Sequence, residues 1–171
     1  MGTINANAIK AAVVSYWRYS RQCPIIALEA SARLQAFNDG GQADVLAVNN
    51  DRLLIETEVK LDMGDFRRDR EKPKHSRLRA NDGSYPTSYF YLAVPREIAN
   101  RVCLVCDQIY PYAGVLGVDG LSEQNAYMYR EAKRLKGGKL TLLQTTRMAK
   151  AQSATLCRLA RALALRDGND G

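Results

Sequence analysis

The sequence lacks any apolar run of the roughly 20 residues that a membrane helix requires. Its first ten residues, MGTINANAIK, lack the cationic start and the apolar stretch of a secretory signal. Cysteine is scarce in this chain of 171 residues, and four scattered cysteines do not make a disulfide framework: Cys23, Cys103, Cys106 and Cys157. We therefore expect a cytoplasmic protein with reduced thiols and no contact with membranes.

Internal repeats and low-complexity segments are also missing. With 46% hydrophobic and 25% charged residues, the composition is that of a globular protein long enough to bury a core. We predict a single domain over 1–171, with a core at about 25–120 and a basic helical segment at about 124–166.

Acidic residues are the minority charge, because 18 Asp and Glu face 25 Lys and Arg and leave a net charge of +7. Most of this excess lies between residues 66 and 80, where seven cations face two acids: Arg67, Arg68, Arg70, Lys72, Lys74, Arg77 and Arg79 against Asp69 and Glu71. A solvated surface explains such a run as well as a polyanionic partner does.

The pattern of apolar residues predicts an α/β protein with a mixed sheet flanked by helices. Strands are expected at 25–36, 43–48, 53–61, 89–94 and 113–118, and helices at 7–19, 95–109, 124–136 and 146–166. The first three strands follow one another through turn residues and form an antiparallel meander. The strand–helix–strand order at 89–118 implies a parallel pair. The segment TLLQTT, at 141–146, is expected to be extended.

Charged residues occupy one face of the third predicted strand. Side chains alternate across a strand, so Leu54, Glu56, Glu58 and Lys60 share a side. Asp44 begins the preceding strand, and the hairpin brings it toward Glu58.

The polar face of the first strand adds Glu29 to these carboxylates. Carboxylates at such a site repel one another unless a proton or a cation lies among them. Mg²⁺ suits one or two carboxylates, several waters and a phosphate oxygen. A lysine beside such an ion can orient a water and offset charge on a phosphoryl group.

Asp44, thirteen residues, and then Glu58-Val59-Lys60 resemble the motif of the PD-(D/E)xK nuclease superfamily. The flanking segments GGQADVLAV, LLIETEVKLDMGDFRRDREK and SYFYLAVP resemble a small bacterial branch of it, the MmcB-like DNA-repair proteins. The resemblance covers roughly residues 25–120. One departure is Ala43, at the position of the superfamily's proline.

The resemblance implies a restriction-endonuclease-like fold and a DNA endonuclease or repair nuclease that depends on Mg²⁺ or Mn²⁺. By this resemblance Asp44 and Glu58 would hold the metal, and Lys60 would serve the attacking water. Glu29 would complete the acidic site. Glu56 lies on the same face and is an alternative ligand to Glu58.

The basic run following the third strand is then expected to contact DNA. Five of its cations are candidates for the phosphate backbone: Arg67, Arg68, Arg70, Lys72 and Lys74. The only histidine, His75, is expected to contact phosphate or to lie on the surface. No residue of the run identifies a base-reading pattern, so binding is expected to be structure-directed or weakly sequence-specific.

Other interpretations remain open from the sequence. The chain is alternatively a DNA-binding protein of this fold that does not cut, or a structural or regulatory partner in a repair or phage complex. A homodimer would suit the cutting of two strands. Cys103 and Cys106 form a CxxC pair, for which we favour core thiols over an iron–sulfur or zinc site.

Overall fold

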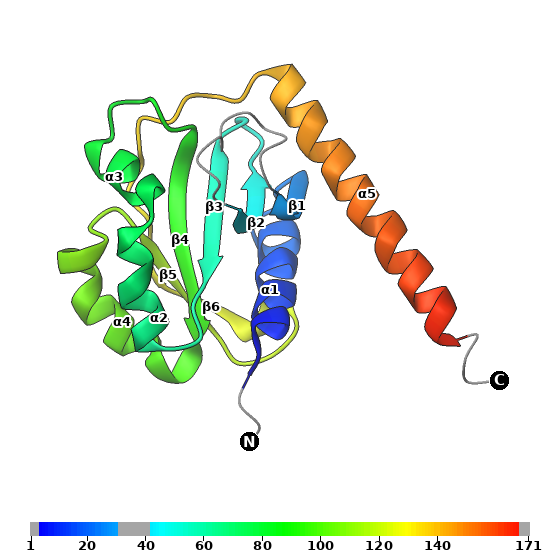
Figure 1. Ribbon diagram of the computed structural model, residues 1–171, viewed down its shortest axis with the longest axis horizontal. Helices are drawn as coiled ribbons and strands as arrows, with labels where there is room; N and C mark the ends of the chain where they lie inside the picture. The colour runs from blue at the N-terminus through cyan, green and yellow to red at the C-terminus, as the bar shows by residue number, and fades with distance from the viewer. Residues whose placement is uncertain (1–3, 31–41, 168–171) are drawn as a thin grey trace.

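The computed structural model describes residues 4–30 and 42–167, and its centre is a six-stranded mixed sheet in the order β1-β2-β3-β4-β5-β6 (Figure 1). The strands are β1 (Ile25–Ala30), β2 (Ala43–Val48), β3 (Leu54–Val59), β4 (Thr87–Pro95), β5 (Gly114–Val118) and β6 (Ala126–Arg130). The first three are antiparallel, β3–β4 and β4–β5 are parallel, and β5–β6 is antiparallel. The predicted α/β class, the meander and the parallel pair are confirmed.

Helices cover both faces of this sheet. They are α1 (Ala6–Ser15) with the π-helical turn η1 (Tyr16–Ser20), α2 (Met63–Arg68), the 3₁₀ turn η2 (Asp69–Glu71), α3 (Pro73–Ala80), α4 (Arg96–Ile109), the 3₁₀ turn η3 (Glu123–Asn125) and α5 (Leu142–Asp167). Helix α1 packs on one face, and α2, α3 and α4 pack on the other (Figure 1). The connection from β3 to β4 therefore runs through α2 and α3, over one face of the sheet.

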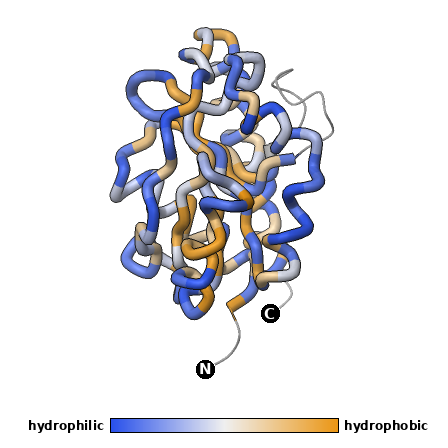
Figure 2. The backbone as a smooth tube through the Cα atoms, turned by 90° about the vertical axis from the view of Figure 1, so that its left-hand side faces the viewer, coloured by the Kyte–Doolittle hydropathy of each residue, from blue (hydrophilic) through white to orange (hydrophobic). Residues whose placement is uncertain are grey.

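Each sheet face has its own core, because alternate residues of the strands point to opposite sides. Val45, Ile55 and Trp17 pack under α1, whereas Leu46, Leu54 and other apolar residues pack under α2, α3 and α4. Figure 2 shows the hydrophobic stretches along the inner segments and hydrophilic ones along many outer turns. Strand β3 is buried along its whole length, which places any charge on it away from water.

Two predicted elements are wrong. The expected helix at 124–136 is absent: the segment begins in η3, forms β6 at 126–130 and is neither helix nor strand at 131–136. In β6, Tyr127 and Tyr129 suit a pleated surface and Met128 pairs with Leu116 of β5. The expected extended segment at 141–146 lies at the start of α5. Thr141 and Gln144 bond each other's backbone N–H reciprocally there, and this capping box begins the helix.

Helix α5 leaves the body of the protein along the edge strand β1 (Figure 1). Met148 in its first half is buried, whereas Leu156, Leu159 and Leu163 are exposed. Among the helices described, none combines the length and hydropathy of a bilayer span. Residues 31–36 of the first predicted strand lie outside the described part of the chain.

Candidate functional site

Strand β3 carries a row of charges that the fold removes from water. Glu56 is fully buried, and the exposed fractions of Glu58 and Lys60 are only 2% and 4%. Helix α3 lies over this side of the strand and supplies buried polar residues of its own. The shared face of these three residues was predicted, but the complete burial was not. We call the following five residues the charge network: Glu56, Glu58, Lys60, Asp69 and Lys74.

Lys74 occupies the centre of the charge network. Its ammonium donates to Oε1 of Glu56 at 2.9 Å and to Oε1 of Glu58. The other oxygen of Glu56 accepts from the hydroxyl of Thr87 on β4, at 2.7 Å. The Lys74 ammonium also lies 5.6 Å from the centre of the Phe90 ring, a cation–π contact.

The expectation that Lys74 contacts a phosphate backbone is wrong, because the residue is only 4% exposed and its ammonium points inward. Burial disfavours its charge, but the carboxylates of Glu56 and Glu58 outweigh burial and raise the pKa of Lys74. Burial raises the pKa of Glu58, with Glu56 adding to the rise and Lys74 and Lys60 opposing it. Lys74 is thus the fixed cation of the network.

Lys60 joins Glu58 to Asp69 of η2. Its ammonium lies 3.3 Å from Oε2 of Glu58 and 2.8 Å from Oδ1 of Asp69. Lys72, half-exposed, reaches the same Asp69 oxygen at 2.6 Å. Lys60 donates a hydrogen bond to Glu58, whereas the two contacts to Asp69 are ion pairs, since its Oδ1 has no hydrogen-bond partner in the described residues. Asp69 therefore fixes the position of the lysine that we predicted to be catalytic.

His75 holds Asp69 from the other side. Its Nε2 lies 2.7 Å from Oδ2 of Asp69, and its Nδ1 lies 2.6 Å from the hydroxyl of Tyr112. An ionised carboxylate only accepts, so the proton on Nε2 is donated to Asp69. Burial acts to raise the pKa of Asp69, but His75 and Lys60 outweigh it and hold that pKa well below its usual range.

The expectation that His75 contacts phosphate or lies on the surface is wrong, because the ring is fully buried. The His75 ring makes an edge-to-face contact with Phe90 of β4, with ring centres 5.3 Å apart. Its role in this structure is to orient Asp69 and, through it, Lys60.

The three predicted carboxylates lie in one row across the meander. Pairs on either side, Leu28 with Val45 and Ala30 with Ala43, place Glu29 opposite Asp44. The pairing of Val45 with Thr57 places Asp44 opposite Glu58 one step further along β3. We call Glu29, Asp44 and Glu58 the carboxylate row. Their backbones lie in register, as the hairpin argument predicted.

The side chains of the carboxylate row divide into two groups. Lys10 of α1 bridges the first two acids, at 2.9 Å from Oε1 of Glu29 and 3.0 Å from Oδ1 of Asp44. Glu58 instead pairs with lysines of the charge network. The link between the groups is the backbone N–H of Val59, which donates to Oδ2 of Asp44 at 2.8 Å.

Glu29 has an unusual backbone for a strand residue, with φ of 47°. A non-glycine residue in this left-handed region costs of order 1–3 kcal/mol and persists only when its surroundings hold it. The surroundings here include the side chain of Gln42, which donates to the carbonyl of Glu29 at 2.7 Å. The strain lies at the outer end of the carboxylate row.

Glu29 and Asp44 of the carboxylate row fit a hard divalent cation in their chemistry, whereas both oxygens of the buried Glu58 contact lysine ammonium groups. Mg²⁺ binds carboxylate oxygens and keeps several waters, and the side chains of Glu29 and Asp44 are 52% and 24% exposed. That Glu29 and Asp44 already share one ammonium shows that they approach closely enough to share a cation. Within 4–30 and 42–167, however, no three His, Cys, Asp or Glu side chains form a ready-made metal group.

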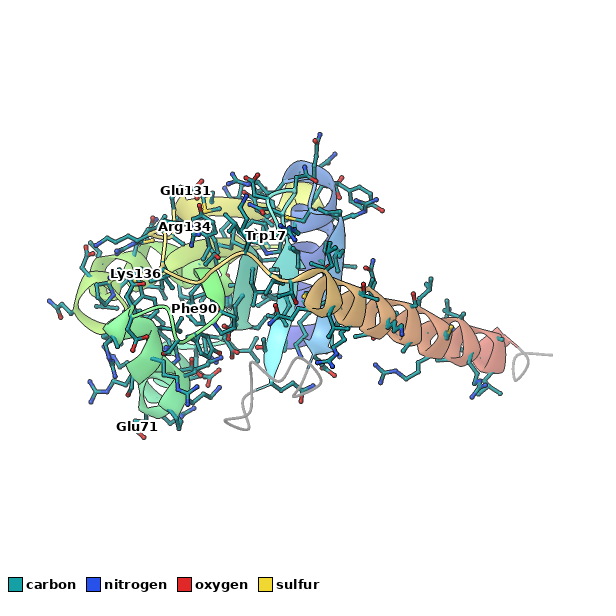
Figure 3. All side chains as sticks on the ribbon, turned by 90° about the horizontal axis from the view of Figure 1, so that it is seen from above. Trp17, Glu71, Phe90, Glu131, Arg134 and Lys136 are labelled. Atoms are coloured by element: carbon teal, nitrogen blue, oxygen red, sulfur yellow. The ribbon has the colours of Figure 1, made fainter. Side chains whose placement is uncertain are left out.

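Four residues that we predicted to bind DNA lie outside this buried region. Arg67, Arg68 and Arg70 are exposed and Lys72 is half-exposed. We call these four the cationic segment. Glu71, between the last two, lies at the outer margin of the molecule (Figure 3). The segment is accessible to a large ligand and ends at Lys72, beside the charge network.

The cysteines lie apart from the charge network. Burial raises the pKa of the Cys23 and Cys106 thiols to about 11 each, which keeps them protonated. Cys103 is part of α4 and packs against the core, and Cys157 is exposed on α5. Cys23 and Cys106 belong to different cores, one on each side of the sheet.

Sequence reasoning missed four participants: Lys10, Asp69, His75 and Tyr112. A signal for α3 was present, because Pro73 stands at its first turn and suits a helix start. Lys74 and His75 then precede Leu78 by four and three residues, so all three share the buried side of the helix. That spacing predicts that the side chains of Lys74 and His75 point into the protein.

Comparison with known proteins adds information about the fold. No family model matches the chain, and no curated protein matches it. A solved structure from Silicibacter pomeroyi, of a protein described as of unknown function, is 17% identical to the chain. The alignment covers 94% of this chain and 90% of that one, with a TM-score of 0.57. At this identity the similarity shows a shared fold.

Proposed function

We propose that the protein is a divalent-metal-dependent DNA nuclease of the restriction-endonuclease-like fold, acting by hydrolysis of phosphodiester bonds. The observation that carries the proposal is the contact between Lys60 and Glu58 at the end of β3, 3.3 Å apart and in register with Asp44. The sequence resemblance supports the same assignment of roles. The cationic segment beside the network supports DNA as the substrate.

Glu29 and Asp44, which already share one cation, would hold the Mg²⁺ or Mn²⁺, which when bound would supply Lewis-acid activation of water and of the phosphoryl oxygens. The chain's own residues do the positioning. Asp69 and Glu58 hold the Lys60 ammonium, so that it can orient a water and offset charge that develops on the phosphoryl group. His75 keeps Asp69 oriented.

The cationic segment would supply affinity without sequence readout. Arginine and lysine side chains contact phosphate oxygens and release counterions, so the affinity should fall steeply with salt concentration. The segment follows β3 along the chain after residues 60–66, which would bring the DNA backbone toward the end of the strand near Glu58 and Lys60.

The test is cleavage of a panel of branched, single-stranded and duplex DNA with Mg²⁺ or Mn²⁺. Lys60→Met keeps the alkyl chain and should lower cleavage by a factor on the order of 100 while most DNA affinity remains. Glu58→Gln should abolish cleavage, and Glu56→Gln, whose side chain bonds Thr87 and Lys74, is the milder control. Circular dichroism checks each fold. Full activity of the Lys60 variant would contradict the proposed catalytic role of Lys60.

A second candidate is a DNA-binding protein of the same fold that does not cut. One observation favours it: lysine ammonium groups already contact both oxygens of the 2%-exposed Glu58 carboxylate. Such a protein would show salt-sensitive DNA affinity and no cleavage with any substrate or metal. The same substrate panel therefore decides between the two candidates.

A further inference from the structure

The Lys10 ammonium lies between two acids of the carboxylate row, at the position where a bound cation would lie. Its ammonium is almost equidistant from two acids of different strands, 2.9 Å from Glu29 and 3.0 Å from Asp44. No other pair within the row shares an ammonium among the described residues. Lys10 comes from α1, one helical turn before the core residue Val13, so its backbone is anchored by the core under α1.

We propose that Lys10 is a tethered competitor of the divalent ion, and that it sets the metal affinity of the Glu29–Asp44 pair. This inference rests on the proposed metal-dependent function. An ion bound by both carboxylates would lie within a few ångströms of the present ammonium position, and like charges at that separation repel. Metal binding therefore requires the Lys10 ammonium to move away. The free energy of its two lost ion pairs then weakens the affinity of the site for the metal.

The charges and exposures agree with an exchange of this kind. Two carboxylates facing one ammonium leave a local charge of −1, whereas a divalent ion in its place balances both. Two carboxylate oxygens within 3.0 Å favour the charged form of the Lys10 ammonium. Lys10 therefore stays a cation throughout the neutral range. Its side chain is 16% exposed, so water is available to the displaced ammonium.

The charge network lacks this property. Lys74 is equally a cation between two carboxylates, but it is buried under α3 and against Phe90. Its departure would leave an ammonium without water or a partner, which is costly. Lys10 is thus the lysine that can yield its place to an ion without unfolding the surrounding structure.

The test is the affinity of the full chain for Mn²⁺ without DNA, measured by electron paramagnetic resonance and by calorimetry. Lys10→Met keeps the alkyl stem and removes the charge, and it should bind Mn²⁺ about tenfold more tightly than the parent. Lys10→Arg retains the competing cation and should bind about as the parent does. Lys150→Met, the same change on an exposed lysine of α5, is the matched control and should also bind like the parent.

Equal Mn²⁺ affinity in the parent and in Lys10→Met would overturn the inference and leave the metal site standing. Weaker binding by Lys10→Met would also overturn it, because Lys10 would then position the carboxylates rather than compete. Absence of Mn²⁺ binding in every variant, with folding confirmed by circular dichroism, would overturn the metal site itself and with it the proposed nuclease. Lys10→Gln repeats the test should Lys10→Met not fold.

Discussion

The two faces of the sheet bury different chemistry beneath similar helical cover. On the α1 face, Trp17 packs edge-on against Tyr91 with ring centres 5.0 Å apart, and its indole N–H donates to Thr57 at 3.0 Å. On the α3 face, the charge network lies beside an apolar core that includes Phe90. Figure 3 marks Trp17 beside α1 and Phe90 apart from it.

Strand β3 contributes to both faces and shows the contrast within six residues. Ile55 and Val59 point into the α1 core, whereas Glu56 and Glu58 point under α3. Apolar burial lowers the free energy of the fold directly. Buried ion pairs seldom do, since the desolvation of each charge offsets their attraction and a well-packed apolar replacement is often as stable. The charges under α3 are therefore weaker evidence of a contribution to stability than the apolar contacts under α1 are.

The largest expected effect on stability comes from a substitution on the α3 face. Lys74→Met removes the cation between Glu56 and Glu58 and leaves two buried carboxylates facing each other. Removal of one partner from a buried pair costs about 3–5 kcal/mol in the free energy of unfolding. Denaturant unfolding monitored by circular dichroism measures it. Arg70→Gln, an exposed cation of the same connection, is the control and should leave stability unchanged. A Lys74 variant as stable as this control would contradict the structural role.

A pH titration sharpens the same comparison with a smaller effect. The folded pKa of Asp69 lies below its unfolded value of about 3.9. A depressed folded pKa adds stability above that unfolded value, and the stability is lost as the pH falls toward the folded pKa. The free energy of unfolding of the parent should therefore decrease below about pH 4, and that of Asp69→Asn should decrease less steeply. Parallel acid limbs for the two proteins would rule out this contribution.

The smallest expected effect tests the α1 face. Trp17→Phe retains most of the apolar contact but leaves the buried hydroxyl of Thr57 without its donor. The expected loss is about 1–2 kcal/mol in the free energy of unfolding. Since no titratable group is removed, the difference from the parent should be the same from pH 5 to pH 8. Tyr19→Phe, at an exposed aromatic residue, is the matched control. A pH-dependent difference would mean that the two faces are coupled.

Local patterns in the sequence were sufficient for the meander and for the shared face of Glu58 and Lys60. Alternation fixes which side chains share a side, and short turns fix which strands are neighbours. The roles of Lys74 and Lys10 were not accessible in this way. Lys74 stands in a run of cations that has the composition of a solvated surface, and only α3 packing on β3 buries it. Lys10 meets Glu29 and Asp44 through contacts 19 and 34 positions apart.

The boundaries of the C-terminal elements illustrate a different limit. The alternation of Tyr127, Met128 and Tyr129 is compatible with a short helix until β5 offers them a partner strand. The start of α5 was readable, because Thr141 and Gln144 have the spacing of a capping box. The helix start at Thr141 is thus encoded locally, whereas β6 depends on its pairing with β5, which the local sequence does not contain.

The route of the chain from β3 to β4 has a consequence for folding kinetics. The connection holds α2, η2 and α3, and it supplies Asp69 and Lys74 to the charge network. Parallel pairing of β3 with β4 requires closure of this long connection, whereas β1, β2 and β3 pair through shorter ones. Closure of the connection also removes water from the charge network. The entropy cost of closure and the cost of desolvation therefore arise in the same folding step. We expect the meander to form early and the β3–β4 pair to complete folding, an order that pulsed hydrogen exchange of the strand amides would reveal.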